Sequence, residues 1–186
     1  MSLTPDYDSF AAGYAEGKNQ IVYTRLAADL DTPVSLMLKL TGAAENAFVL
    51  ESVTGGEVRG RYSIIGMKPD LIWRCNGTTS AVNRAARYDG DAFEDAAAGL
   101  FGYLGYDMIR LVEHLPNVNP DTLGLPDAMM VRPSVIAVLD GVKGEVTIVS
   151  PAWVSDGQTA KAAYAQAGER VMDAVRDLER SMPGTS

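Results

Sequence analysis

Stretches in which apolar and polar residues alternate recur along this chain and predict a series of short strands. Residues 20–26 are rich in β-branched and aromatic side chains, which favour a strand. Further strands are predicted at residues 47–52, 61–66, 71–75, 78–86, 131–139 and 145–149. Asn76-Gly77 is the strongest hairpin signal between them, and Lys68-Pro69-Asp70 predicts another turn.

Helical spacing appears at both ends of the chain. Residues 8–16 predict a short helix that ends at Gly17. The last periodic segment, residues 159–182, predicts one long amphipathic helix. Its apolar stripe consists of Ala160, Tyr164, Ala167, Val171, Val175, Leu178 and Met182.

Two shorter helices are predicted between the strands. One has Thr32 as its N-cap and Pro33 as its first residue, and it ends at Gly42. Its predicted apolar face contains Val34, Met37, Leu38 and Thr41. The other is capped by Asp107 and stopped by Pro116. Its stripe contains Met108, Leu111, Val112 and Leu115.

The order of these elements predicts the fold class. Strands follow one another as hairpins and do not alternate with helices, which is typical of an antiparallel α+β protein. We expect an antiparallel β-sheet sandwich with flanking helices. The predicted organisation is an N-terminal segment, residues 1–19, followed by one domain, residues 20–186. Residues 88–97 are polar and acidic and predict a mobile loop.

The most unusual segment lies at residues 98–110, where Gly99, Gly102 and Gly105 recur every third residue beside large apolar side chains. Glycine weakens a strand, so three of them indicate that something approaches the backbone closely. The spacing does not match a dinucleotide-binding loop, and the glycines lie within the strand instead of leading into a helix. The pattern therefore predicts a scaffold with a pocket.

Composition narrows the possible functions. The chain has 186 residues, with 16 Lys and Arg against 24 Asp and Glu, and a formal net charge of −8. An acidic protein repels nucleic acid and anionic membrane surfaces, so we expect neither as a partner. Cys75 and His114 are the single cysteine and histidine, too few for a disulfide or a metal site, and Cys75 is predicted to be a buried strand residue. With no signal peptide or membrane-spanning run, we expect a cytoplasmic location.

Polar residues gather where two predicted strands meet. Glu51 and Ser52 follow Leu50 at a strand end, and Arg61 lies within ten residues of Glu51. A carboxylate and hydroxyl near an ammonium, with an arginine near a carboxylate, would hold a zwitterion. The alternative is a strand-end cap beside solvated arginines. His114 lacks a recognisable partner for general-base catalysis, so no catalytic residue is predicted.

Five segments together resemble a known family: residues 23–34, 48–53, 60–66, 98–107 and 123–128. In this order they are similar to the N-terminal part of anthranilate synthase component I, within the chorismate-utilising enzyme group. The resemblance implies a large subunit, a lyase, that converts chorismate to anthranilate and pyruvate with Mg²⁺. Its ammonia would come from a glutamine amidotransferase partner, component II.

The resemblance also implies a regulatory role in tryptophan biosynthesis. The N-terminal domain of this family carries the tryptophan feedback pocket, whose Leu-Glu-Ser element matches Leu50, Glu51 and Ser52. Arg61 is expected to be the basic residue near the inhibitor. The strand at residues 103–106 is expected to lie deep in the domain, near its junction with the catalytic part.

The match is to only part of the family's large subunits, whose catalytic machinery and metal-binding glutamates lie in the C-terminal portion. We therefore expect this chain alone to be inactive and to lack the Mg²⁺ site. Two alternatives remain open. One is component I of aminodeoxychorismate (para-aminobenzoate) synthase, and the other is a non-enzymatic amino-acid-binding module.

Overall fold

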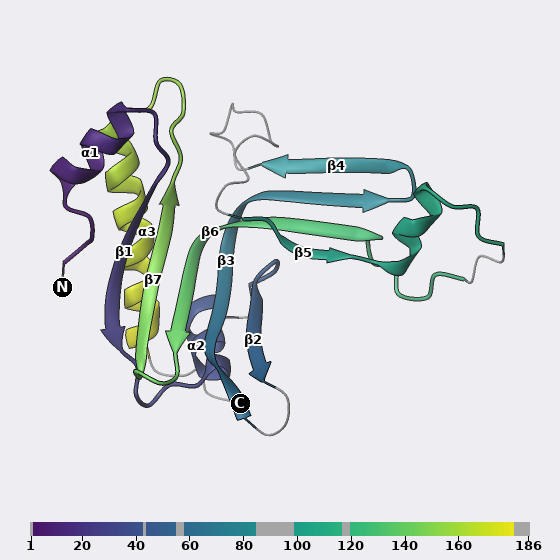
Figure 1. Ribbon diagram of the computed structural model, residues 1–186, viewed down its shortest axis with the longest axis horizontal. Helices are drawn as coiled ribbons and strands as arrows, with labels where there is room; N and C mark the ends of the chain where they lie inside the picture. Colours follow the sequence, from purple (N-terminus) through teal and green to yellow (C-terminus); the bar gives the residue numbers. More distant parts are fainter. Residues whose placement is uncertain (1, 43, 55–57, 85–98, 117–119, 181–186) are drawn as a thin grey trace. The chain divides into compact units, whose positions relative to one another are not determined.

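The computed structural model describes residues 2–42, 44–54, 58–84, 99–116 and 120–180 (Figure 1). The predicted loop at residues 88–97 lies outside them. The elements, in chain order, are α1 (Tyr7–Ala15), β1 (Gln20–Ala27), α2 (Pro33–Thr41), β2 (Phe48–Thr54), β3 (Val58–Asn76), β4 (Thr79–Arg84), β5 (Phe101–Leu104), the 3₁₀ helix η2 (Tyr106–Leu111), β6 (Ala128–Asp140), β7 (Glu145–Ala152) and α3 (Ala160–Glu179).

The predicted antiparallel α+β class is confirmed. The seven strands of the described residues form one hydrogen-bonded sheet with flanking helices. Its order is β1-β7-β6-β3-β2, with β4 beside β3 and β5 beside β6. The described registers are antiparallel, both for consecutive strands such as β6 and β7 and for β1 and β7, which are distant in the chain.

The chain divides into two compact units. The first consists of Met1–Pro69 and Pro133–Ser186, and the second of Asp70–Arg132. The strands β3 and β6 run from one unit into the other. The division into a segment at residues 1–19 and a domain at residues 20–186 stays a prediction.

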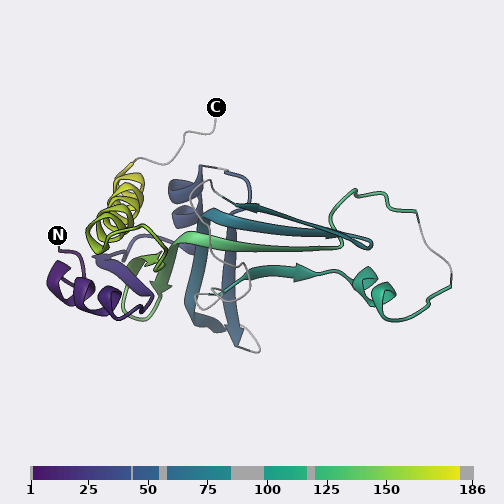
Figure 2. The same ribbon diagram turned by 90° about the horizontal axis from the view of Figure 1, so that it is seen from above.

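In the first unit, α3 packs on β1 and β7, and it also contacts α1 and α2 (Figure 2). Two clusters of buried side chains lie along α3. Ala163 and Ala167 pack with Phe10 and Tyr14 of α1, while Val171 and the residues after it pack with α2 and the sheet. Each buried valine contributes roughly 1.5–3 kcal/mol of burial free energy, so α3 supplies much of the core. Its start after Thr159 is confirmed, and Ala167, Val171 and Val175 of the predicted stripe are buried. The helix ends at Glu179, and Met182 of the stripe lies outside the described residues.

The predicted apolar face of α2 is wrong, although its ends are confirmed. Thr32 and Ser35 form a reciprocal capping box, and Gly42 ends the helix in the left-handed conformation. The buried residues are Leu36 and Leu40, whereas 63% of Val34 is exposed. Both faces of this short helix carry apolar residues, so periodicity alone could not choose between them.

The predicted turn at Lys68-Pro69-Asp70 is also wrong. The two strands expected on either side of it form one strand, β3. Lys68 adopts a φ of 49°, and its carbonyl accepts a hydrogen bond from the Ser134 hydroxyl of β6. The left-handed residue and the proline, which has no N–H to pair, allow an irregular strand to continue where a turn was expected.

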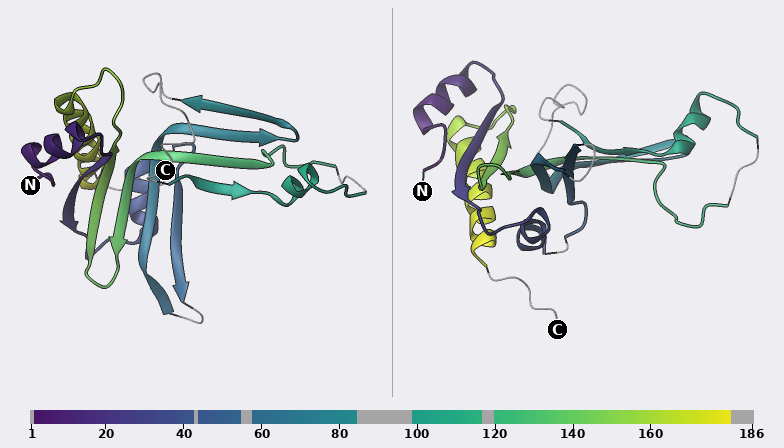
Figure 3. Two further views of the ribbon diagram at one scale, coloured as in Figure 1. Left: turned by 45° about the horizontal axis from the view of Figure 1, so that its top comes forward. Right: turned by 60° about the horizontal axis from the view of Figure 1, so that its bottom comes forward.

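The second unit contains residues 70–76 of β3 and residues 128–132 of β6, together with β4 and β5 (Figure 3). The hairpin at Asn76-Gly77 is confirmed, with Gly77 at a φ of 55°. Cys75 is buried, as predicted. A buried ion pair joins Arg132 Nε to Asp70 Oδ1 at 2.7 Å between β6 and β3.

The helix predicted after Asp107 is replaced by the shorter η2. Its N-cap is Gly105, which has no side chain to cap it, and the Asp107 carboxylate instead pairs with Arg110 at 2.6 Å. Leu111 and Val112 of the predicted stripe are exposed. A six-residue 3₁₀ helix has no continuous face to bury, because such helices stay short.

The glycine-rich strand is approached closely, as predicted, but by protein backbone. A Cβ on Gly102 would overlap the carbonyl oxygen of Met129, and one on Gly105 would lie 2.7 Å from that of Asp127. The expectation that residues 103–106 lie deep is wrong for this chain, because Tyr103, Leu104 and Tyr106 are 42%, 63% and 80% exposed. The glycines therefore serve the pairing of β5 with β6.

Candidate functional site

The residues singled out by sequence lie on two paired strands of the first unit. Leu50, Glu51 and Ser52 belong to β2, and Arg61 belongs to β3. Glu51 is directly opposite Ser63, which is two residues from Arg61 along β3. The pairing places Glu51 and Arg61 on adjacent strands, two residues apart in register along β3. Leu50 is 49% exposed and alternates with Glu51 on the opposite face, while the side chain of Ser52 lies outside the described residues.

The ladder between β2 and β3 is interrupted beside Arg61. Glu51 pairs with Ser63, but Val53 pairs with Arg59, so three residues of β3 oppose Ser52 alone. Extra residues of this kind bend a strand and turn a side chain away from regular alternation. At this irregularity the orientation of the Arg61 side chain does not follow from strand alternation alone.

Arg61 is held by a carboxylate from a different hairpin. Its Nε lies 3.1 Å from both Oδ1 and Oδ2 of Asp140, and its Nη2 lies 2.8 Å from Oδ2. Two parallel N–H donors on one carboxylate form the forked geometry that arginine makes with carboxylates. The guanidinium also lies over the ring of Tyr62, 4.9 Å from its centroid.

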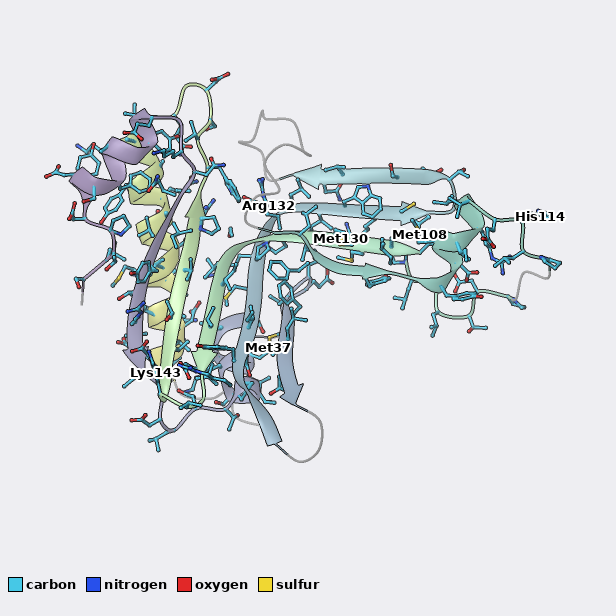
Figure 4. All side chains as sticks on the ribbon, viewed as in Figure 1. Met37, Met108, His114, Met130, Arg132 and Lys143 are labelled. Atoms are coloured by element: carbon cyan, nitrogen blue, oxygen red, sulfur yellow. The ribbon has the colours of Figure 1, made fainter. Side chains whose placement is uncertain are left out.

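Asp140 is itself fixed by the β6–β7 turn, where Lys143 is labelled in Figure 4. Its Oδ1 accepts hydrogen bonds from the backbone N–H groups of Val142, at 3.1 Å, and Lys143, at 3.2 Å. Hydrogen bonds from Arg61 and from these two N–H groups lower the pKa of the Asp140 carboxyl to about 2. The same carboxylate raises the pKa of Arg61.

Part of the Arg61 guanidinium remains open to a ligand. The side chain is 45% exposed, against 11% for Asp140. Within the described residues, every hydrogen bond of the guanidinium comes from Nε and Nη2, which leaves the two N–H groups of Nη1 available. Glu51, on the paired strand β2, is exposed. A fixed cation and an accessible carboxylate on adjacent strands are the two kinds of group that bind the charged ends of an amino acid.

A separate crevice of about 250 Å³ lies elsewhere in the first unit, and none of the four predicted residues lines it. Its apolar walls come from β1, β7 and α3, and Asp31 and Glu179 supply carboxylates. Asp31 is already engaged by Lys39 Nζ and Ser35 Oγ, each at 2.8 Å. Satisfied in this way, Asp31 stabilises the start of α2 and offers little to a ligand.

Neither the single histidine nor a cluster of possible metal ligands adds a second candidate site among the described residues. His114 lies exposed in the segment after η2 (Figure 4). Among the residues that the structure describes, no group of three His, Cys, Asp or Glu side chains could hold a metal ion. No helix in the described ranges is long and apolar enough to cross a bilayer.

Sequence reasoning missed Asp140. The sequence identifies residues 140–144 only as the connection between two predicted strands. An aspartate at the start of a turn usually accepts hydrogen bonds from nearby backbone N–H groups, so Asp140 gave no sign of a further role. Its second partner, Arg61, is 79 residues away in the chain. Nothing local in the sequence connects the two.

Comparison with known proteins gives concordant names. Anthranilate synthase component 1 of Cereibacter sphaeroides is 62% identical to this chain over 203 residues, covering 95% of this chain and 41% of that protein. The Thermus thermophilus protein of the same name is 34% identical, covering 84% of this chain and 36% of its own length. No family model matches the chain.

A solved structure gives a similar name. The chain is similar to anthranilate synthase component I from Streptococcus pneumoniae, with a TM-score of 0.48 and 20% identity. That comparison covers 82% of this chain and 37% of the other. The chain thus spans about two fifths of the length of the curated relatives it matches, 41% and 36% for the two named above.

Proposed function

We propose that this chain, a relative of anthranilate synthase component 1 over 95% of its length, is the regulatory and subunit-docking portion of such an enzyme. The complete enzyme converts chorismate and glutamine-derived ammonia to anthranilate and pyruvate in tryptophan biosynthesis. It acts as a lyase in the cytoplasm, with Mg²⁺ bound outside this chain and with the amidotransferase component II as partner.

The proposed task of this chain is to bind tryptophan as a feedback inhibitor. Leu50, Glu51, Ser52 and Arg61 form the site, with the Glu51 carboxylate accepting the ligand's ammonium. The Nη1 group of Arg61 donates to the ligand's carboxylate. Charge-assisted hydrogen bonds of this kind are about twice as strong as neutral ones.

The observation that carries this proposal is the pairing of β2 with β3. It places Glu51 opposite Ser63, two residues from Arg61. The two residues therefore supply an anionic and a cationic group on adjacent strands, the two kinds of partner that the ammonium and the carboxylate of an α-amino acid require.

Inhibition requires that tryptophan bind one arrangement of the complete enzyme more tightly than another. A ligand shifts such an equilibrium only by its difference in affinity for the two states. Coupling free energies between sites are typically about 1–3 kcal/mol. The residues of this chain accordingly contribute to ligand binding and perform no step of the reaction.

The test is a steady-state assay of the complete protein with chorismate, ammonia and increasing L-tryptophan, with the product identified by chromatography. We expect anthranilate, and inhibition that weakens about 10-fold or more in Glu51→Gln, because a charged hydrogen bond contributes about 1.5–3 kcal/mol. Glu169→Gln, a matched change at an exposed position of α3, should leave inhibition unchanged. Formation of para-aminobenzoate, or unchanged inhibition in Glu51→Gln, would contradict the proposal.

A further inference from the structure

We propose that Asp140, through the β6–β7 turn, is a positioning residue that directs the Arg61 guanidinium toward the carboxylate of the bound amino acid. This inference rests on the proposed function. It assigns a role to a residue 79 positions from Arg61 in the chain and absent from the site predicted by sequence.

The first argument is geometric. Asp140 occupies the Nε edge of the guanidinium, with contacts of 3.1 Å to Nε and 2.8 Å to Nη2. Because the group is planar, fixing this edge also fixes the direction of the two N–H groups of Nη1. Asp140 thus determines where a second carboxylate can bind.

The second argument concerns the anchoring of the turn. The Gly141 N–H donates to the Arg61 carbonyl at 2.9 Å, so the turn holds both the backbone and the side chain of Arg61. At the other end of the turn, the Gly144 carbonyl accepts from the Ala28 N–H at 2.7 Å. Asp140 is therefore part of a supported structure and differs from a mobile surface counter-ion.

The third argument is electrostatic competition. An arginine side chain can lose roughly 2 kcal/mol of rotamer entropy when it is fixed, so an unsupported Arg61 would sample many positions. Glu51 of the paired strand β2 is an exposed carboxylate. An ion pair between Arg61 and Glu51 would occupy both groups of the proposed site. Asp140 binds Arg61 through Nε and Nη2 instead, which leaves Nη1 free to donate to a ligand.

The experiment measures ligand binding to the complete protein by calorimetry. Asp140→Asn should weaken L-tryptophan binding about 10-fold, which corresponds to about 1.4 kcal/mol. Binding of tryptamine, which keeps the ammonium and lacks the carboxylate, should change less than about two-fold on the same scale. If Asp140 merely supported the fold, its substitution would lower the affinity for both ligands to the same extent. A larger loss for L-tryptophan than for tryptamine therefore identifies a positioning role.

A double-mutant cycle supplies a second, independent readout with L-tryptophan alone. Arg61→Ala should weaken binding, and adding Asp140→Asn to it should cause no further loss, because Asp140 acts through Arg61. Asp31→Asn is the matched control, since Asp31 also pairs with a cation at 2.8 Å and accepts a further hydrogen bond, from the Ser35 hydroxyl. It should leave the affinity for both ligands unchanged.

The outcomes separate the two proposals. Weaker tryptophan binding in Arg61→Ala with unchanged binding in Asp140→Asn overturns the role of Asp140 and leaves the site intact. Equal losses for tryptophan and tryptamine in Asp140→Asn, or additive losses in the cycle, also overturn it. Absence of tryptophan binding by the unsubstituted protein overturns both the site and the positioning role.

Discussion

Asp140 shows how one side chain can connect local and distant structure. Its carboxylate accepts two N–H groups of its own turn and two donors of Arg61 on another hairpin. Each of these contacts favours the charged form of the carboxyl, which is why its pKa lies well below the ordinary value. The same contacts connect the stability of this region to pH.

Protonation of Asp140 at low pH should therefore lower the stability of the folded protein. Because the pKa of Asp140 is lowered from 3.8 to about 2, its contribution is complete above about pH 4 and is lost between about pH 4 and pH 2. The urea midpoint of the unsubstituted protein should exceed that of Asp140→Asn at pH 5. The difference should shrink steadily as the pH approaches 2. A difference that stays constant over this range would show that Asp140 has an ordinary pKa.

At the scale of elements, the glycine strand β5 is shaped by the strand beside it. Gly102 pairs with Met130, and the neighbouring carbonyl of Met129 occupies the space where a Cβ would lie. Backbone cannot move aside as a flexible side chain can. The three-residue spacing that suggested a ligand pocket thus reflects close packing between strands, at least at Gly102 and Gly105.

Two glycine-to-alanine substitutions should have opposite effects. Gly102→Ala should destabilise the protein by about 1–3 kcal/mol, as overpacking typically does. Gly13→Ala in α1 meets only the end of the Gln20 side chain and should be neutral or stabilise by up to about 1 kcal/mol, because alanine favours a helix. Chemical denaturation of the two variants measures both values. Equal stabilities would contradict the close approach at β5.

At the scale of the whole molecule, the described residues form a scaffold with a candidate binding site and no recognisable catalytic group. Arg61 and Glu51 lie on paired strands of the first unit, whereas His114 and Cys75 belong to the second unit. Large enzymes commonly separate the site that binds a regulator from the site of chemistry, and the two communicate through a change in domain arrangement.

We expect the purified 186-residue chain to form no anthranilate from chorismate, ammonia and Mg²⁺, because general acid–base chemistry needs positioned groups and the described residues present none that is recognisable. A fluorescence assay for anthranilate measures this directly, with the complete protein as the positive control. Product formed by the chain alone at a rate comparable to the complete protein would contradict the assignment.

Much of the local structure could be predicted from sequence because its causes are local. The Asn76-Gly77 hairpin, the capping box at Thr32 and the amphipathic stripe of α3 each depend on residues within a few positions of one another. The same applies to the pairing of consecutive strands, from which the antiparallel α+β class followed. The polar residues of the candidate site were also recognisable, since Glu51 and Arg61 lie on adjacent strands.

Tertiary structure decided what depends on neighbours distant in sequence. The buried face of α2 was chosen by α3 and the sheet, and β3 continues through Pro69 because pairing partners are present on both sides of it. The partner of Arg61 comes from a turn 79 residues later. Burial and long-range ion pairs arise only when separate segments pack together, so the sequence pattern identified the residues while the fold determined which of them meet.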